Sequence, residues 1–125
     1  MKFGAIFVTL SLLVNTSVAQ AAPWKLPKSN WGGAKPRNLS SWYGYNDYPT
    51  AADRAGEQGY VTVAFDIGID GRMANCTVVR SSGYSRLDAV PCKALPQRAR
   101  FRPAKDASGR PVVTRGTTSM AFWKE

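Results

Sequence analysis

Residues 48–72 read YPTAADRAGEQGYVTVAFDIGIDGR, and this stretch decides the fold. Pro49 can occupy the first turn of a helix, where its missing N–H costs nothing, so we expect a helix over residues 50–55 that ends at a following glycine. Residues 61–67 alternate between apolar and small or polar side chains, which predicts a half-buried strand. Asp70-Gly71 then predicts a tight hairpin turn, because glycine tolerates the positive φ that such turns require.

The remaining elements follow from proline and glycine positions. Asp88 predicts the N-cap of a second helix, and Pro91 would fall at its third position, where the N–H lacks a partner. Pro96 should make the helix kink or end, because its nitrogen cannot donate back to a carbonyl. Gly109-Arg110-Pro111 turns the chain into a final strand over residues 112–122. The order α-β-β-α-β predicts an α+β fold: a small antiparallel three-stranded sheet with two helices packed on one face.

Two cysteines lie in this region. Residues 73–81 are predicted to form the second strand, with Cys76 and Val78 on the side that faces the core, and Cys92 lies in the second helix. In an oxidising compartment such a pair favours a disulfide. A redox motif needs Cys-x-x-Cys, and a metal site needs more ligands than the chain offers. Closing a loop of about 16 residues would stabilise the fold by roughly 3 kcal/mol.

The first residues are typical of a targeting segment. Lys2 precedes a mostly apolar run from Phe3 to Val14, and Ala19-Gln20-Ala21 supplies small residues for cleavage. We therefore expect a signal peptide over residues 1–21. An uncleaved anchor from Phe3 to Ala22 is the alternative, although the apolar run is shorter than the roughly 20 residues that span a bilayer.

Residues 22–47 form a linker or arm rich in proline, glycine and aromatic rings, ahead of a folded domain over residues 48–125. A solvent-exposed linker rarely carries so many rings. We expect some of them to fold back on the domain, with stacking on carbohydrate as the alternative. The rings in this stretch are Trp24, Trp31, Trp42, Tyr43 and Tyr45.

The composition restricts the function. The formal net charge is +9 and the chain has no histidine. The scattered cations indicate a solvated basic surface, or attraction to anionic lipid head groups or an anionic envelope polymer. We expect no nucleic acid, since the chain is exported and carries no recognised nucleic-acid motif. Without histidine the serines lack the usual general base, so we expect no enzyme, no catalytic residue, no cofactor and no metal site.

Taken together, the ordered motifs resemble the C-terminal domain of TonB, the energy transducer of outer-membrane transport. The resemblance covers residues 48–122. It rests on Tyr48-Pro49, Gly59, the alternating strand, Asp70-Gly71-Arg72, Ser81-Ser82-Gly83, Leu87-Asp88 and Phe101-x-Pro103-Ala104. It implies that a periplasmic domain binds a short peptide of an outer-membrane transporter, or another periplasmic protein, by strand addition. In that mode backbone bonds give affinity and side-chain pockets give selectivity.

Carried over to this chain, the resemblance implies that the last strand is the binding edge, with an outward N–H such as that of Thr117. Gly116 and Thr118 are expected on the core side. A glycine inside a strand weakens it and allows another backbone to approach closely, so Gly116 either loosens the edge or admits a partner strand. An unprotected edge also predicts a homodimer by edge pairing. The candidate partner-binding residues are Tyr48, Pro49, Val112, Thr114, Gly116, Thr118 and Met120.

Two features differ from the transducer pattern. The resemblance implies a membrane helix with a histidine and a long proline-rich spacer, whereas this chain has no histidine and only about 25 linker residues, which reach roughly 80–90 Å. We therefore expect a periplasmic binding domain without the motor. The alternatives are a short TonB-like transducer anchored in the inner membrane and facing the periplasm, or an envelope structural module that binds cell-wall polymer.

Overall fold

The computed structural model describes residues 24–124, so the predicted signal peptide or anchor lies outside the described residues. The elements are β1 (Lys35–Pro36), η3 (Leu39–Ser41), η4 (Tyr45–Asp47), α2 (Thr50–Arg54), β2 (Gly59–Ile67), β3 (Met73–Arg80), α3 (Ser85–Asp88), α4 (Pro91–Arg98), β4 (Phe101–Arg102), β5 (Ala104–Lys105), β6 (Pro111–Val112) and β7 (Thr114–Phe122).

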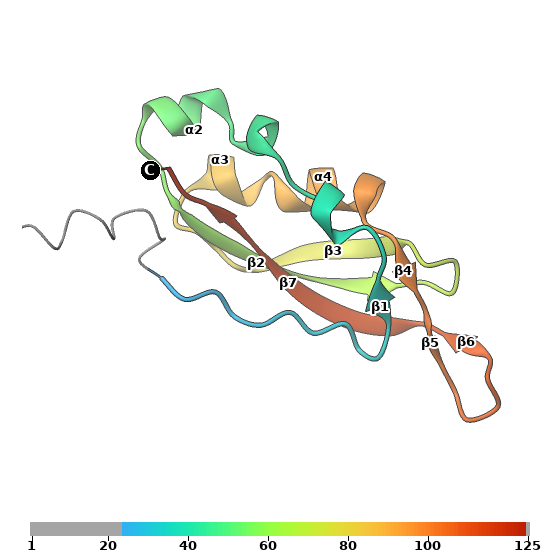
Figure 1. Cartoon of the computed structure of the whole chain (residues 1–125). Coiled ribbons are helices and arrows are strands. Elements are labelled where there is room, and N and C mark those ends of the chain that lie inside the picture. Colours follow the sequence, from blue (N-terminus) through green and yellow to red (C-terminus); the bar gives the residue numbers. More distant parts are fainter. Residues whose placement is uncertain (1–23, 125) are drawn as a thin grey trace, which may run out of the picture.

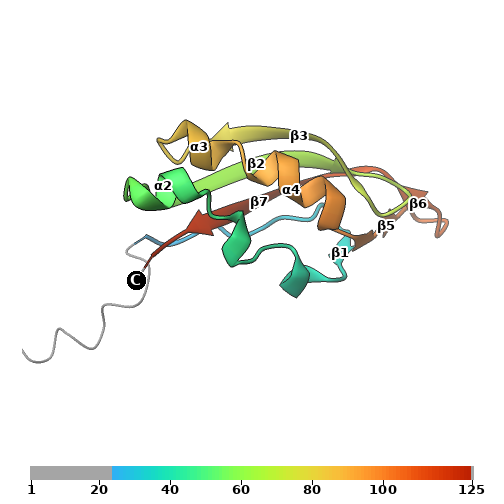
Figure 2. The ribbon, with the colours of Figure 1, turned by 90° about the horizontal axis from the view of Figure 1, so that it is seen from above.

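The main sheet has three antiparallel strands in the order β3-β2-β7. Helices α2, α3 and α4 all lie on one face of this sheet (Figures 1 and 2). The predicted α+β fold is confirmed. Two short ladders, β1-β4 and β5-β6, join it at one end.

The core lies between the sheet and the helices. Val61, Val63, Phe65 and Ile67 of β2 are fully buried, as their alternation predicts. Leu87 and Leu95 cover them from α3 and α4, together with Trp42, Phe101, Met120 and Phe122. Each large side chain buried in this way contributes about 1.5–3 kcal/mol.

The predicted hairpin between β2 and β3 is present but has a longer loop than a two-residue turn. Gly68 N–H donates to Arg72 O at 2.9 Å, and Gly71, with φ of 79°, donates to Gly68 O at 2.9 Å. The prediction that Val78 faces the core is wrong, because the side chain of Val78 is not buried. Val78 pairs with Val63 but is 40% exposed, because β3 is the edge of the sheet.

The second helical region differs from prediction in three details. Asp88 ends α3 and does not cap the longer helix, because its carboxylate accepts hydrogen bonds from Ser82 N and Ser82 Oγ, at 2.8 and 2.7 Å, and from Ser81 Oγ. Pro91 is the first residue of α4 and not its third. Pro96 lies inside α4, which ends two residues later at Arg98, so the alternative in which Pro96 ends the helix is wrong, and the kink stays a prediction.

The final strand is divided. β6 pairs with β5 in a separate hairpin, and only Thr114–Phe122 joins the main sheet. The predicted disulfide is confirmed: Cys76 of β3 and Cys92 of α4 are bonded, with their Cα atoms 5.4 Å apart. None of the helices in residues 24–124 is both long and apolar enough to cross a membrane.

Candidate partner-binding edge

Strand β7 forms one edge of the main sheet and pairs with β2 in a single unbroken register. Nine consecutive pairs run from Gly59 opposite Phe122 to Ile67 opposite Thr114. In an antiparallel strand the backbone groups of successive residues point alternately to the two sides. Thr117 points away from β2, since it exchanges two hydrogen bonds with Asn30, at 2.8 and 2.9 Å. The outward groups of β7 therefore belong to Arg115, Thr117, Ser119 and Ala121.

The N-terminal segment (residues 24–33) runs beside this outer edge, and its backbone pairs with one half of it (Figure 1). Besides the Asn30–Thr117 bridge, Ser29 Oγ lies 2.8 Å from Thr118 Oγ1. Trp31 is half-buried, and its ring lies 5.6 Å from that of Trp42 and 5.5 Å from that of Phe101. Aromatic pairs at such separations stabilise beyond their burial alone. Trp31 therefore anchors the segment to the core next to the residue that pairs with β7.

Two glycines permit this close approach. A Cβ on Gly116 would lie 2.9 Å from Asn30 O and 3.0 Å from Phe65 Cε2. A Cβ on Gly32, whose φ is 62°, would lie 2.5 Å from Arg115 O. The backbone that lies against Gly116 belongs to the same chain, and admission of a partner strand there stays a prediction.

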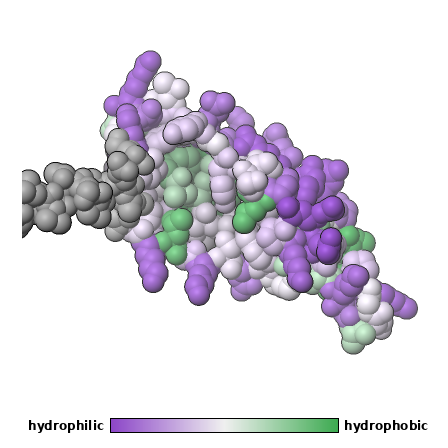
Figure 3. Space-filling model, in the orientation of Figure 1, coloured by the Kyte–Doolittle hydropathy of each residue, from purple (hydrophilic) through white to green (hydrophobic). Residues whose placement is uncertain are grey.

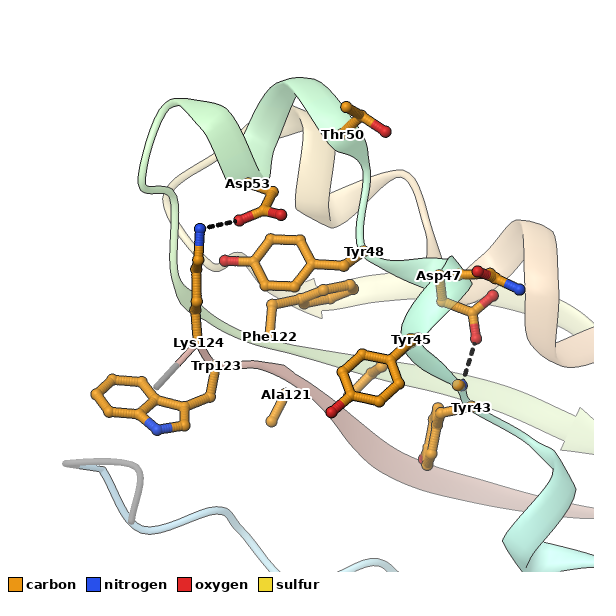
Figure 4. A pocket seen from close by; sticks show the side chains of 13 residues that line it. Tyr43, Tyr45, Asp47, Tyr48, Thr50, Asp53, Ala121, Phe122, Trp123 and Lys124 are labelled. Carbon is orange, nitrogen blue, oxygen red and sulfur yellow. Dashed lines mark hydrogen bonds and ion pairs between the residues drawn. The ribbon is translucent and has the colours of Figure 1, made fainter. Parts of the chain in front are cut away.

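The backbone of the other half of the edge is unpaired. Among residues 24–124, the outward backbone groups of Ser119 and Ala121 have no hydrogen-bond partner. We call this half open, although the Trp24 ring packs against Trp123 at its end. Beside them lies a groove with a volume of about 890 Å³, between β7 and the strap (residues 43–48) that contains η4. Figure 4 shows Tyr43 and Tyr45 on one side of the groove and Ala121 to Lys124 on the other. Tyr45 is 97% exposed, so it is an aromatic side chain with no role in the core.

The strap is held in place from both ends. Trp42 is fully buried, and its Nε1 donates to Asn38 Oδ1 at 2.9 Å. Arg98 Nη1 of α4 donates to Asp47 Oδ2 at 2.8 Å, and this hydrogen bond lowers the pKa of Asp47. Burial raises the pKa of Tyr43, an effect that the nearby Thr118 side chain opposes. The groove wall is therefore built from anchored residues.

The far end of the groove is closed by a second set of contacts. The Tyr48 hydroxyl donates to Glu57 O, and its ring packs edge-on against Phe122 at 5.6 Å. Burial raises the pKa of Tyr48, and the nearby Asp53 carboxylate raises it further. Lys124 Nζ lies 2.7 Å from Asp53 Oδ1, which raises the pKa of Lys124. These contacts connect α2 to the end of β7.

The opposite edge of the sheet is irregular. The β2-β3 pairing shifts register twice, and Asn75 of β3 has a positive φ of 51°. Bulges of this kind twist an edge and interrupt the row of groups that a further strand would need. Of the two edges of the main sheet, β7 is the regular one.

The residues named from the sequence divide into two groups. Tyr48 and Met120 line the groove, and Pro49 adjoins it in the chain. Gly116, Thr118 and Met120 are buried on the core side of β7, Thr114 begins that strand, and Val112 lies in the separate strand β6. Sequence reasoning did not include Ser119, Ala121, Tyr43 or Tyr45 among the partner-binding residues. The alternation of β7 could have identified the first two, whereas nothing local identifies the strap.

Most of the rings before residue 48 fold back on the domain, as expected. Trp42 and Trp31 pack in the core, and Trp24 lies 5.1 Å from the ring of Trp123 and 6.3 Å from that of Tyr60. The alternative in which these tryptophans stack on carbohydrate does not fit Trp42, which has no exposed surface. Among the rings of residues 24–47, Tyr45 is the most exposed, at 97%, and Tyr43 is also exposed.

Comparison with known proteins agrees with this geometry. The family described as "Gram-negative bacterial TonB protein C-terminal" matches residues 44–123, which begin at the strap. A solution NMR structure of the Pseudomonas aeruginosa TonB CTD is similar in fold, with a TM-score of 0.56 and 30% sequence identity. That match covers 77% of this chain and 91% of the Pseudomonas chain. A search of the curated proteins found no match.

Proposed function

This chain belongs to the TonB C-terminal domain family, and from that membership we propose that it binds an extended peptide in the periplasm by strand addition to β7. The family is associated with TonB-dependent transport and is not a known enzyme family. The proposed partner is a segment of an outer-membrane transporter or of another periplasmic protein.

The open half of the outer edge is the observation that carries this proposal. Ser119 and Ala121 present backbone donors and acceptors next to a groove wide enough for side chains. A partner strand there would gain backbone hydrogen bonds from both residues, and alternate partner side chains would enter the groove. Each such bond contributes about 0.5–1.5 kcal/mol net.

The N-terminal segment sets the extent of the docking site in this proposal. Asn30 already uses the outward groups of Thr117, so a partner strand would pair along residues 119–122 and end at the bridge between Asn30 and Thr117. A longer partner strand would have to displace Asn30 and withdraw Trp31 from the core. Short partner segments are therefore favoured.

A single substitution tests the edge. Ser119→Pro removes the outward N–H, and proline is tolerated on an edge strand where that N–H faces away from the sheet. Synthetic peptides from the periplasmic ends of outer-membrane transporters serve as probes, with binding followed by amide chemical shifts. For the wild-type domain we expect the amide shift changes to concentrate at residues 119–122. Ser119→Pro should weaken peptide binding about tenfold or more, because it removes roughly one backbone hydrogen bond to the partner strand.

The matched control is Ser119→Ala, which keeps the N–H and removes only the side-chain hydrogen bond to Thr62 Oγ1 at 2.7 Å. It should bind within about threefold of wild type, because the partner contacts the backbone. Equal binding by wild type and Ser119→Pro would exclude the β7 edge. A failure of every transporter peptide to bind the wild-type domain would exclude the transporter as partner.

A further inference from the structure

A small sheet at the end of the molecule away from the C-terminus carries an unusual number of cations (Figure 1). In the β1-β4 ladder Lys35 lies directly opposite Arg102. Arg37 N–H extends the ladder by donating to Arg100 O at 2.9 Å. On the other side of β4, Arg72 forms a bridge with Arg100, and Phe101 N–H donates to Gly71 O at 2.8 Å.

The alternation of β4 places these cations on one face. Phe101 points into the core and is 2% exposed. Its neighbours Arg100 and Arg102 therefore point to the opposite face, and residues paired opposite them share that face. We call this surface the basic face: Lys35, Arg37, Arg72, Arg100 and Arg102. All are exposed except Arg100, which is partly buried. Figure 3 shows hydrophilic side chains gathered over this end of the molecule.

The basic face is electrostatically unfavourable within the protein itself. Like charges directly opposite each other on paired strands are destabilising, and this face contains three such pairs. The ion pairs formed among residues 24–124 use other cations: Arg86, Arg98, Arg115 and Lys124. The adjoining hollow of about 360 Å³ has one carboxylate in its lining, that of Asp70. Asp70 Oδ1 accepts from the backbone N–H of Arg72 at 3.1 Å.

We propose that the basic face docks on an anionic phospholipid surface. Four of its five cations are arginines, whose planar guanidinium groups bind phosphate in a bidentate manner. Ile69 lies in the β2-β3 turn two residues before Gly71 and is 59% exposed, so it supplies an aliphatic side chain for the interface. A sugar polymer would favour exposed rings for stacking, but Phe101, the aromatic residue of this region, points into the core.

Vesicle sedimentation with the full chain tests the proposal. The vesicles are phosphatidylcholine alone or phosphatidylcholine mixed with phosphatidylglycerol. The test variant is the triple substitution Arg37→Gln, Arg72→Gln and Arg102→Gln. We expect its partition onto the anionic vesicles to fall roughly 100-fold, since each basic residue at an anionic surface contributes separately. The N-terminal apolar residues are present in every variant, so their own affinity cancels in the comparison.

The matched control neutralises three exposed cations elsewhere, with Lys28→Gln, Arg54→Gln and Lys93→Gln. It has the same net charge and should keep binding within about threefold. Equal losses in the two triple variants would overturn the proposal, because net charge alone would then explain binding. Two further results would overturn the proposal. One is wild-type binding that is equal on vesicles with and without phosphatidylglycerol, and the other is binding to isolated cell-wall polymer without binding to vesicles.

Thermal unfolding adds an independent readout. Since the substitutions relieve cross-strand repulsion, the basic-face variant should unfold at the same temperature as wild type or higher. A clear fall in that temperature would overturn the view that these cations are unfavourable within the fold. The inference does not depend on peptide binding at β7, so Ser119→Pro should leave vesicle binding unchanged.

Discussion

The two edge strands of the main sheet, β3 and β7, differ in regularity and in what covers them. Strand β3 is irregular, with two register shifts and a positive φ at Asn75, and the Cys76–Cys92 disulfide ties it to α4. Strand β7 is regular over nine residues, and only a segment of the same chain covers part of it. An irregular edge excludes further strands by its shape, whereas a regular edge must be covered to be protected. The difference shows that the regular edge is the one with unpaired backbone groups, and that these lie in only one half of it.

The largest expected effect concerns the β3 edge. Replacing both cysteines, Cys76→Ser and Cys92→Ser, removes the link between β3 and α4 and should lower the free energy of unfolding by about 3 kcal/mol. Urea denaturation of the variant and of oxidised wild type measures the difference. The variant should keep its transporter-peptide affinity, because β7 does not depend on the disulfide. A parallel loss of affinity would mean that the two edges are coupled.

The next effect concerns the covered half of β7. Gly116→Ala places a Cβ 2.9 Å from Asn30 O and 3.0 Å from Phe65 Cε2, so the N-terminal segment must move away, at a cost of about 2 kcal/mol for overpacking and lost contacts. Urea denaturation measures the loss of stability, and the amide chemical shift of Thr117 reports whether the N-terminal segment has moved. Gly44→Ala is the control, since no heavy atom lies within 4 Å of its added Cβ. If Asn30 stays paired in Gly116→Ala, the glycine is not what admits the segment.

Hydrogen exchange compares the two halves of β7 directly. The Thr117 amide donates to Asn30 O at 2.8 Å, so it should exchange at least about tenfold more slowly than the outward amides of Ser119 and Ala121. The measurement is amide exchange by NMR on the wild-type protein. Similar rates at all three amides would show that the segment does not hold the edge in solution.

The smallest effect concerns a carboxylate that contacts residues of both edge strands. Asp66 of β2 accepts hydrogen bonds from Asn75 Nδ2 of β3 at 2.7 Å and from Arg115 Nη1 of β7 at 2.9 Å. Both contacts lower its pKa below the ordinary value of 3.8, with Asn75 as the larger cause. Because the folded pKa is depressed, the contribution of Asp66 to stability is present above pH 3.8 and is lost as the pH falls through the folded value.

Carboxyl titration by NMR checks this assignment. Asn75→Ala and Arg115→Gln should each raise the pKa of Asp66, since the first removes the hydrogen bond from Asn75 and the second removes the hydrogen bond and the positive charge of Arg115. An unchanged pKa in either variant would show that the corresponding contact is not formed in solution. Neither variant should change the exposed surface of the strap or its groove.

Sequence reasoning predicted the parts of the fold that depend on local patterns. The alternation of residues 61–67 identified β2, and Asp70-Gly71 identified the hairpin that follows it. It failed where a distant group supplied the partner. Asp88 was predicted to cap a helix, but its carboxylate accepts hydrogen bonds from Ser81 and Ser82 instead.

For the same reason, the sequence predicted only part of the candidate site. Periodicity indicated that Gly116 and Thr118 face the core, and they do. No local signal shows that Asn30 pairs with Thr117, which lies far along the chain, or that Tyr43 and Tyr45 line the groove beside Ala121.

By itself the sequence determined the order of the three main-sheet strands, the family to which the chain belongs and the pairing of its two cysteines. These depend on periodicity, turn chemistry and residue type, which act over a few positions. Only the tertiary structure decided which half of β7 is open and that five cations share one face. Both depend on backbone pairing between distant segments, Asn30 with Thr117 and Lys35 with Arg102, and such pairing is set by how the whole chain packs around its core.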